Sequence, residues 1–330
     1  MVCRPTSKFN RTSQVLVASA HASRIRKFIL EDCGAYDTNH LARIFSKPAP
    51  NLTHLELWTP RLGEITPFPN LFGLELPKLR KLELGGVGAW PKIVGANLAW
   101  IRIDESLDPH ILSRCIPYSP NLKVLKLMDI WDISELDVST WQRIALPPGV
   151  RLTIKYSPMC PLVLALFSLP QDCHLKVGHS VYITPGTSLL SRVLPDDIAP
   201  FQNLRTLTRL HITARFNLEI GLELKCFRSN WPALDVNIRF FPDMPTVAEE
   251  NGTPAMRLLG NLRRIVLKGM EELRMEGFVG RLKPQAVELF AFLKRMPALT
   301  RLITTDDNEE VLRYVLDIIG RRAVVVKVER

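Results

Sequence analysis

Three kinds of residue group in this sequence have a composition that could support chemistry, and the first is a glycine cluster. Gly85-Gly86-Val87-Gly88 follows an alternating apolar stretch that is typical of a strand, which is where phosphate-binding loops begin. The cluster lacks the third glycine of a dinucleotide fingerprint and the Gly-Lys-Ser/Thr of a P-loop. We therefore interpret it as a turn that leaves a strand.

The other two kinds are metal-ligating and acidic residues. Cys173-His174 and His179 could approach a metal ion, but two or three ligands without further support are a weak zinc signal. Asp104-Glu105 and Asp306-Asp307 are paired carboxylates that could act in acid–base catalysis, although solvated loops carry such pairs more often. The sequence contains no G-x-S-x-G, H-E-x-x-H or kinase-like motif set. We therefore predict a protein that is not an enzyme and that needs no metal and no cofactor.

The elements that would position these residues belong to an internal repeat of the form L-x-x-L-x-L. The clearest copies begin at Leu52, Leu79 and Leu122, each preceded by Asn or Lys. Including weaker copies, the starting positions are 25, 52, 79, 98, 122, 149, 172, 207, 233, 262, 299 and 323. Most intervals lie in or near the range of about 20–29 residues that leucine-rich repeats show.

The last two apolar residues of each copy are two positions apart, so they point to one face of a short strand. Between these strands the apolar spacing predicts helices at Asp37–Phe45, Asp108–Cys115, Val138–Ala145, Pro284–Met296 and Glu309–Ile319. The sequence thus predicts an α/β fold, an irregular leucine-rich-repeat solenoid with parallel strands on its concave face and helices on its convex face. We expect about twelve repeats over residues 25–330, interrupted by loops at Gly178–Pro200 and Phe241–Met256, after a basic N-terminal segment, 1–24.

Composition restricts the setting of the protein more than its function. The net charge of +10 favours acidic partners but identifies none of them. Six cysteines without a C-x-x-C pair fit reduced, buried thiols. Because no hydrophobic leader opens the sequence and its apolar runs are short, we expect a cytoplasmic or nuclear protein that does not associate with membranes.

The strand residues that alternate with the buried leucines are the expected binding surface. Of 36 such positions, 13 are Lys or Arg and six are Asp or Glu, so the surface is more basic than the whole chain. The candidate partner-binding residues are Trp58, Lys81, Trp100, Arg102, Lys126, Met128, Arg151, Lys155, Lys176, Arg209, Arg239, Arg264, Lys268 and Arg301. Large apolar groups beside charges are typical of protein-binding hot spots. An acidic protein is the expected partner; nucleic acid is less expected, because no nucleic-acid-binding motif is present. The alternative is that any exposed strand face carries such charge.

Several stretches of the sequence resemble a known protein family in their residue pattern and spacing. Residues 46–52, 76–82 and 112–127, together with Trp90-Pro91, are similar to the C-terminal repeat region of F-box proteins from mushroom-forming fungi. The resemblance covers most of the chain. It implies that the repeats hold a substrate for a cullin-RING ubiquitin ligase.

One departure from that family affects the adaptor. An F-box is a helical module that docks a Skp-type adaptor, and residues 1–24 are too short to contain one. Leu194-Pro195-Asp196-Asp197-Ile198 imitates its opening, but Pro200 and the next repeat strand follow immediately. We therefore expect an adaptor only if an F-box is encoded upstream. The alternative function is a stand-alone repeat scaffold that binds an acidic protein or RNA without a ubiquitin-ligase role.

Overall fold

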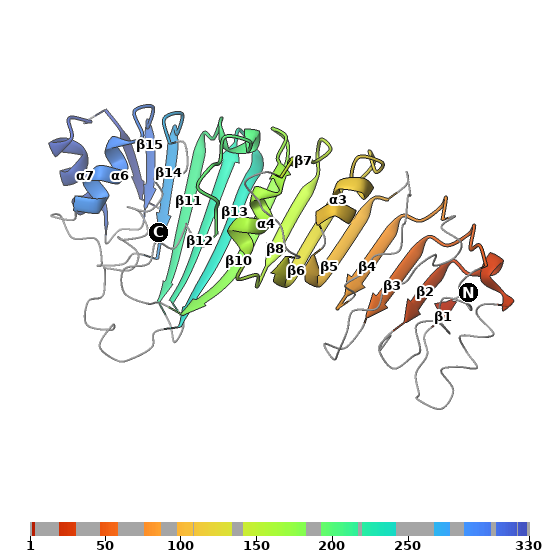
Figure 1. Cartoon of the computed structure of the whole chain (residues 1–330). Coiled ribbons are helices and arrows are strands. Elements are labelled where there is room, and N and C mark those ends of the chain that lie inside the picture. Colours follow the sequence, from red (N-terminus) through yellow and green to blue (C-terminus); the bar gives the residue numbers. More distant parts are fainter. Residues whose placement is uncertain are drawn as a thin grey trace. The chain divides into compact units, whose positions relative to one another are not determined.

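The computed structural model describes residues 2–3, 20–30, 47–58, 76–86, 98–107, 109–133, 141–182, 193–216, 220–241, 267–277, 287–304, 308–321 and 323–328. These residues form an α/β structure of mostly parallel sheet with few helices (Figure 1). The chain divides into two compact units, Met1–Ser168 (unit 1) and Leu169–Arg330 (unit 2). The predicted helix at Asp37–Phe45 and the Asp306-Asp307 pair lie outside the described residues.

Unit 1 is built on seven parallel strands that neighbour one another in chain order. They are β1 (Val2–Cys3), β2 (Lys27–Leu30), β3 (His54–Trp58), β4 (Lys81–Gly85), β5 (Trp100–Leu107), β6 (Val124–Ile133) and β8 (Arg151–Lys155). The pairing aligns the repeats position by position, so that Leu55 pairs with Leu82 and Leu82 with Ile101. Strand β1 lies inside the segment that we expected to precede the first repeat.

A short turn before the strand recurs in both units and explains where the strands begin. The amide of Leu79 donates a hydrogen bond to the carbonyl of Leu76 (3.0 Å), and Leu52 and Leu122 make the same bond to the residue three before them. Both apolar ends of the turn are buried, as Leu76 and Leu79 show. Each turn therefore anchors the chain in the core just before the extended backbone starts.

The same backbone conformation also recurs at one equivalent position along four strands of unit 1. Gly86, Glu105, Asp129 and Tyr156 each follow a register-equivalent residue, and all four have positive φ, between 50° and 78°. Only glycine adopts this left-handed region without steric cost. Gly86 and Tyr156 directly follow the last residues of β4 and β8, which supports our interpretation of the glycine cluster at Gly86 as a turn. Glu105 and Asp129 lie within β5 and β6, and the register of this pair shifts after Asp104.

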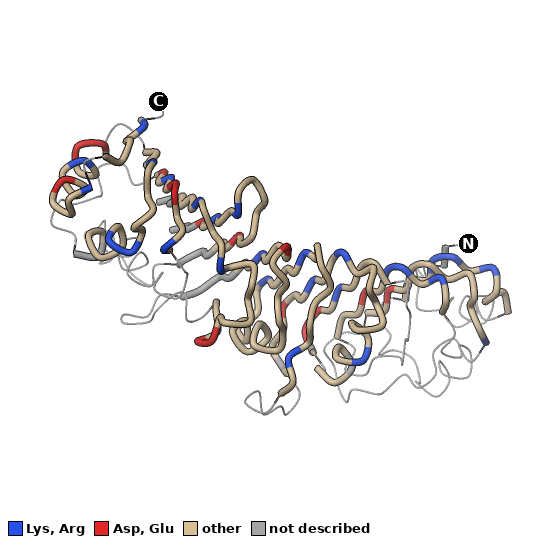
Figure 2. Tube along the Cα trace, turned by 90° about the horizontal axis from the view of Figure 1, so that it is seen from above, with Lys and Arg blue, Asp and Glu red and all other residues tan. Residues whose placement is uncertain are grey.

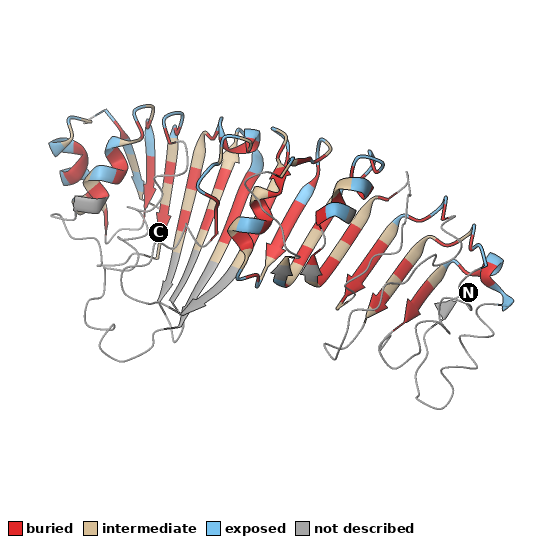
Figure 3. Ribbon diagram, in the orientation of Figure 1, coloured by how far each residue is buried: buried red, intermediate tan, exposed pale blue. Residues whose placement is uncertain are grey.

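Alternation along the strands separates an apolar face from a polar face. Leu55, Leu57, Leu82 and Leu84 are at most 1% exposed, whereas residues between them are mostly part-exposed (Figure 3). The leucine side is sealed by connecting segments that include helix α3 (Pro109–Cys115) and helix α4 (Cys160–Ala165), whose apolar side chains Leu112 and Leu164 are fully buried. The opposite side of the strands is called the polar face below.

The helix expected at Val138–Ala145 is wrong at its C-terminal end. Ile144–Ala145 forms β7, which pairs in parallel with β9 (Phe167–Ser168), and residues 141–143 are not helical. Ile144 and Leu146 are buried on either side of exposed Ala145, a strand pattern, and Pro147-Pro148 follows. The prolines lack the amide protons that a continuing helix would need. Residues 138–140 lie outside the described part of the chain.

Unit 2 departs from the simple repeat order. Its strands are β10 (His174–Tyr182), β11 (Arg209–Phe216), β12 (Ile220–Arg228), β13 (Trp231–Phe241), β14 (Glu272–Glu276), β15 (Arg301–Thr304) and β16 (Val325–Val328). Their spatial order is β10-β13-β12-β11-β14-β15-β16, with β12 antiparallel to both neighbours. The expectation of parallel strands arranged in chain order is wrong here, because β11, β12 and β13 form a meander. The expected loop at Gly178–Pro200 also begins with strand residues, since β10 extends to Tyr182.

The repeat predicted at residue 262 is misplaced. Leu267 lies outside any strand, and the strand that follows is β14, with Leu273 and Met275 buried. The turn before it joins Leu267 to Met270 by a 3.1 Å backbone hydrogen bond, as in unit 1. Met270 and Met275 occupy two positions where the repeat pattern predicts Leu or Ile. The flexible thioether side chain of methionine packs well at such core positions, so the leucine pattern did not predict β14.

The remaining helix predictions are confirmed within the described residues. α3 lies inside Asp108–Cys115, α6 (Val287–Lys294) inside Pro284–Met296, and α7 (Glu309–Ile318) inside Glu309–Ile319. Helix α7 starts with Glu309 and Glu310, whose negative charge is favourable at a helix N-terminus. No helix among the described residues is both long and apolar enough to cross a bilayer.

Candidate binding face

The polar face of unit 1 carries three rows of side chains, because the parallel register places equivalent residues of successive strands side by side. The first row is His54, Lys81, Trp100, Val124, Arg151; the second is Glu56, Glu83, Arg102, Lys126, Thr153; and the third is Trp58, Gly85, Asp104, Met128, Lys155. Figure 2 shows Lys and Arg recurring along these strands with Asp and Glu between them. Eight of the fourteen predicted site residues are thus gathered on one surface.

Glu83 is the centre of the charged contacts on β3–β5. Its side chain is only 8% exposed, and Oε1 accepts from the Lys81 Nζ at 2.6 Å. The same oxygen lies 3.4 Å from His54 Nε2, while Oε2 lies 3.9 Å from Arg102 Nη1. Arg102 in turn makes a bidentate pair with Asp104, at 2.8 and 2.7 Å. Lys81 and Arg102, which we expected to attract an acidic partner, are therefore neutralised within the protein.

Trp58 lies flat over β4, and a glycine makes room for it. A Cβ atom at Gly85 would approach Trp58 Cε3 to 2.1 Å, which is closer than any real contact. The indole N–H donates to Glu56 Oε1 (2.8 Å), and the Arg102 guanidinium lies 5.1 Å from the ring centroid. The ring is therefore held from three directions, so the first glycine of the cluster serves aromatic packing.

Trp100 lies between two cations in the next part of the face. Lys81 Nζ is 4.4 Å and Lys126 Nζ 5.4 Å from its ring centroid, both within the range of cation–π attraction. Trp58, Trp100 and Met128 are all part-exposed. They can contact a ligand while remaining fixed by their neighbours.

The β6–β8 part of the face is different, and we call Lys126, Arg151 and Lys155 the basic zone. Unlike Lys81 and Arg102, these three residues have no carboxylate partner among the residues that the structure describes. Arg151 is exposed and the other two are part-exposed. Two exposed aromatic residues belong to the same part of the chain: Trp131, 55% exposed, lies near the end of β6, and Tyr156, 46% exposed, directly follows β8. The sequence pattern did not single out these two aromatic residues.

The predicted site residues of unit 2 lie on a more nearly neutral face. Lys176 pairs with Asp235 at 2.8 Å, and Arg301 lies 3.3 Å from Glu272. Arg209 donates to the carbonyl of Ser229 and stacks 5.1 Å from the Phe227 ring centroid. Strands β12 and β14 add Glu223, Glu272 and Glu276, which the predicted set did not contain. The prediction of a basic surface therefore fits unit 2 less well than unit 1.

Of the three remaining predicted site residues, one lies in a turn and two have no described side chain. Lys268 is exposed in the turn before β14, so its predicted placement on a strand face was wrong. The prediction depended on the repeat at residue 262, which was misplaced. Arg239 belongs to β13, but its side chain is not described. Arg264 lies outside the described residues.

Burial alters the protonation of several polar-face groups. Burial, with Lys81 and Lys27 nearby, lowers the pKa of His54 below 6.5 despite Glu83 and Glu56. Burial likewise lowers the pKa of His211 despite Glu272. Burial raises the pKa of Asp104, although the bond from Arg102 opposes this. Both histidines are therefore predominantly neutral at pH 7.

The cysteines behave as the sequence predicted where they are described. Cys115, Cys160, Cys173 and Cys226 are buried thiols that are not joined in disulfides. Burial raises the pKa of the Cys115 thiol to about 11 and that of Cys226 to about 12, so both are unreactive thiols at pH 7.

Within the described residues, the one His/Cys/Asp/Glu group with metal-binding geometry is His54, Glu56 and Glu83. Cys173 and His174 are not part of such a group, and the side chain of His179 is not described. The sequence pattern placed all three members of the group on the polar face. The exact 27-residue spacing of Glu56 and Glu83 would have shown that they are neighbours. No protein-family model, curated protein or solved structure matches the chain.

Proposed function

We propose that this chain is a leucine-rich-repeat binding module that captures an acidic segment of another protein on the polar face of unit 1. The repeat assignment is supported by in-register strands, recurring entry turns and a left-handed residue that recurs at the equivalent position of four strands. Solenoids of this kind characteristically bind partners on their strand surface.

The observation that carries the proposal is the basic zone. Most other cations of the face are paired internally, whereas Lys126, Arg151 and Lys155 are available on adjacent strands next to Trp100 and Met128. Neighbouring strands are about 4.8 Å apart, so these cations match carboxylates spaced along a peptide that crosses the strands. Part-exposed aromatic and methionine side chains supply apolar contact area.

The test measures binding of a fluorescent ten-residue Asp/Glu-rich peptide to the full chain by anisotropy. Arg151→Glu/Lys155→Glu should weaken binding more than tenfold, since two attractive contacts become repulsive. The matched control is Arg114→Glu/Lys294→Glu, which makes the same charge change at exposed residues on helices α3 and α6. The control should bind like the parent protein at equal ionic strength.

Equal weakening by both double variants would reduce the effect to net charge and overturn the proposed location. A ten-residue oligouridine that binds more tightly than the peptide would favour the RNA-binding alternative instead. Circular dichroism of each variant establishes that the fold is retained.

The resemblance to F-box repeat regions makes substrate recognition for a ubiquitin ligase the biological role that we propose for this binding. A pull-down of a Skp-type adaptor with the product of the complete gene tests that role. Absence of the adaptor would leave the stand-alone scaffold as the function, without changing the expected behaviour of the basic zone.

A further inference from the structure

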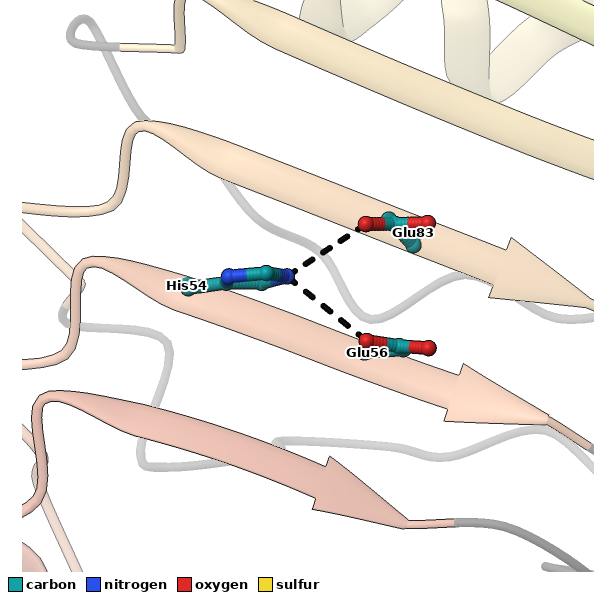
Figure 4. A group of neighbouring side chains, drawn as sticks. All are labelled: His54, Glu56 and Glu83. Carbon is teal, nitrogen blue, oxygen red and sulfur yellow. Dashed lines mark ion pairs between the residues drawn. The ribbon is translucent and has the colours of Figure 1, made fainter. Parts of the chain in front are cut away.

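Three polar side chains on β3 and β4 converge at one point of the polar face. His54 and Glu56 are two residues apart on β3, so both project from the same side. Glu83 is the register partner of Glu56 on β4. Figure 4 shows the His54 imidazole directed between the two carboxylates.

The spacing of the donor atoms fits a small metal ion. His54 Nε2 is 3.4 Å from Glu83 Oε1 and 3.7 Å from Glu56 Oε2, and the three ligand atoms lie within 4.8 Å of one another. Ligands held at about 2.0–2.2 Å around a tetrahedral zinc ion are roughly 3.3–3.6 Å apart. Side-chain adjustments of about one ångström would therefore complete the coordination.

The state of His54 also suits a ligand. Its Nε2 atom is buried and has no hydrogen-bond partner. In the tautomer that carries the lone pair on Nε2, this nitrogen faces two carboxylates that offer no proton, and a cation between the three groups would satisfy it.

We propose that His54, Glu56 and Glu83 bind a divalent transition-metal ion of the zinc type. One imidazole and two carboxylates suit such ions better than Ca²⁺ or Mg²⁺, which prefer more ligands and oxygen alone. The side chains of His54 and Glu56 are 15% and 20% exposed, which leaves the site open to an ion from solution.

Lys81 is the natural competitor of the ion. Its ammonium group is 2.6 Å from the same Glu83 oxygen that faces His54, and it also lies over Trp100. Metal binding must displace the lysine from Glu83, so Lys81 and the ion compensate the same negative charge in turn. Removing the lysine charge should therefore strengthen metal binding, a result opposite in sign to that of removing a ligand.

The experiment is calorimetric titration of the EDTA-treated full chain with Zn²⁺ at pH 7. His54→Gln and Glu83→Gln should each weaken the site at least tenfold, and Lys81→Met should strengthen it several-fold. His211→Gln is the matched control, because His211 also lies on a polar face, 3.5 Å from a glutamate, and should leave the affinity unchanged.

A Co²⁺ absorption spectrum provides the second readout. A site made of nitrogen and oxygen ligands gives no thiolate charge-transfer band, which separates it from adventitious binding by cysteines. Failure of the chain to bind Zn²⁺, or binding that is unaffected by His54→Gln, would overturn the proposal. If Glu83→Gln does not fold, the opposite responses of His54→Gln and Lys81→Met still decide the question.

Discussion

The two units are built from similar strands but differ in how the chain connects them. In the main sheet of unit 1 each strand lies parallel beside the one before it, from β1 to β6 and then β8, while in unit 2 the order becomes β10-β13-β12-β11-β14. The meander inserts β12 in the reverse direction, and its turn at Ser229-Asn230 joins β12 to β13. An alternation of apolar residues therefore specifies a strand, whereas the connecting segments decide the direction of the strand and which strands lie beside it.

The polar faces differ for the same reason. The meander brings Glu223 and Lys225 into the middle of the unit 2 face, where they pair at 2.8 Å. In unit 1 no such strand intervenes, and the basic zone remains at β6 and β8. An extra strand that supplies both charge signs thus converts an attractive surface into a balanced one.

The largest expected effect tests whether β12 is as integral to unit 2 as β4 is to unit 1. Leu224 on β12 and Leu82 on β4 are both fully buried. We expect Leu224→Ala and Leu82→Ala each to lower the free energy of unfolding by about 2–5 kcal/mol, measured by urea denaturation. Leu162→Ala, at a 41% exposed position on α4, is the control and should change little. A cost below about 0.5 kcal/mol for Leu224→Ala would make β12 peripheral.

A smaller effect concerns acid stability, where both units contain a buried histidine. Because the folded-state pKa of each lies below 6.5, the unfolded chain binds more protons between the two pKa values. The contribution of each neutral histidine to the free energy of unfolding is therefore complete above pH 6.5. It is lost as the pH decreases through the folded-state pKa. His54→Gln and His211→Gln should each flatten this decline in unfolding experiments between pH 7 and pH 5.

Charged groups from several strands face each histidine. His54 faces Lys27 on β2, Glu56 on β3, and Lys81 and Glu83 on β4. His211 faces Arg209 on β11, Lys225 on β12, and Glu272 and Arg274 on β14. An unchanged pH dependence in both variants would mean that other groups control acid stability.

The smallest expected effect comes from the left-handed residues. Tyr156 ends β8 in unit 1 at φ 55°, and Ser229 occupies the hairpin turn of unit 2 at φ 52°. Replacing either by glycine removes a cost of about 1–2 kcal/mol but adds backbone entropy worth about 0.5–1 kcal/mol. We expect a net gain of up to about 1 kcal/mol in unfolding free energy. Destabilisation by Tyr156→Gly would show that its side chain contributes more than the strain costs.

Local periodicity in the sequence was enough to predict the strands of unit 1 and their two faces. The regular spacing of leucines predicted Leu55, Leu82 and Leu125 as core and placed Lys126 and Arg151 opposite to them. It also predicted helices α3, α6 and α7. These features follow from local periodicity, because burial of alternate residues on one side is enough to specify a strand and its faces.

Which charges remain available and which strands are neighbours depends on contacts made in the folded chain. Ile220, Leu222, Leu224 and Cys226 alternate as clearly as any repeat, yet nothing local indicates that β12 runs backwards between β11 and β13. Pairing of Lys81 with Glu83 and of Lys176 with Asp235 likewise depends on register across strands. Such contacts form between residues distant in sequence, so composition could predict a basic face but could not locate its unpaired part.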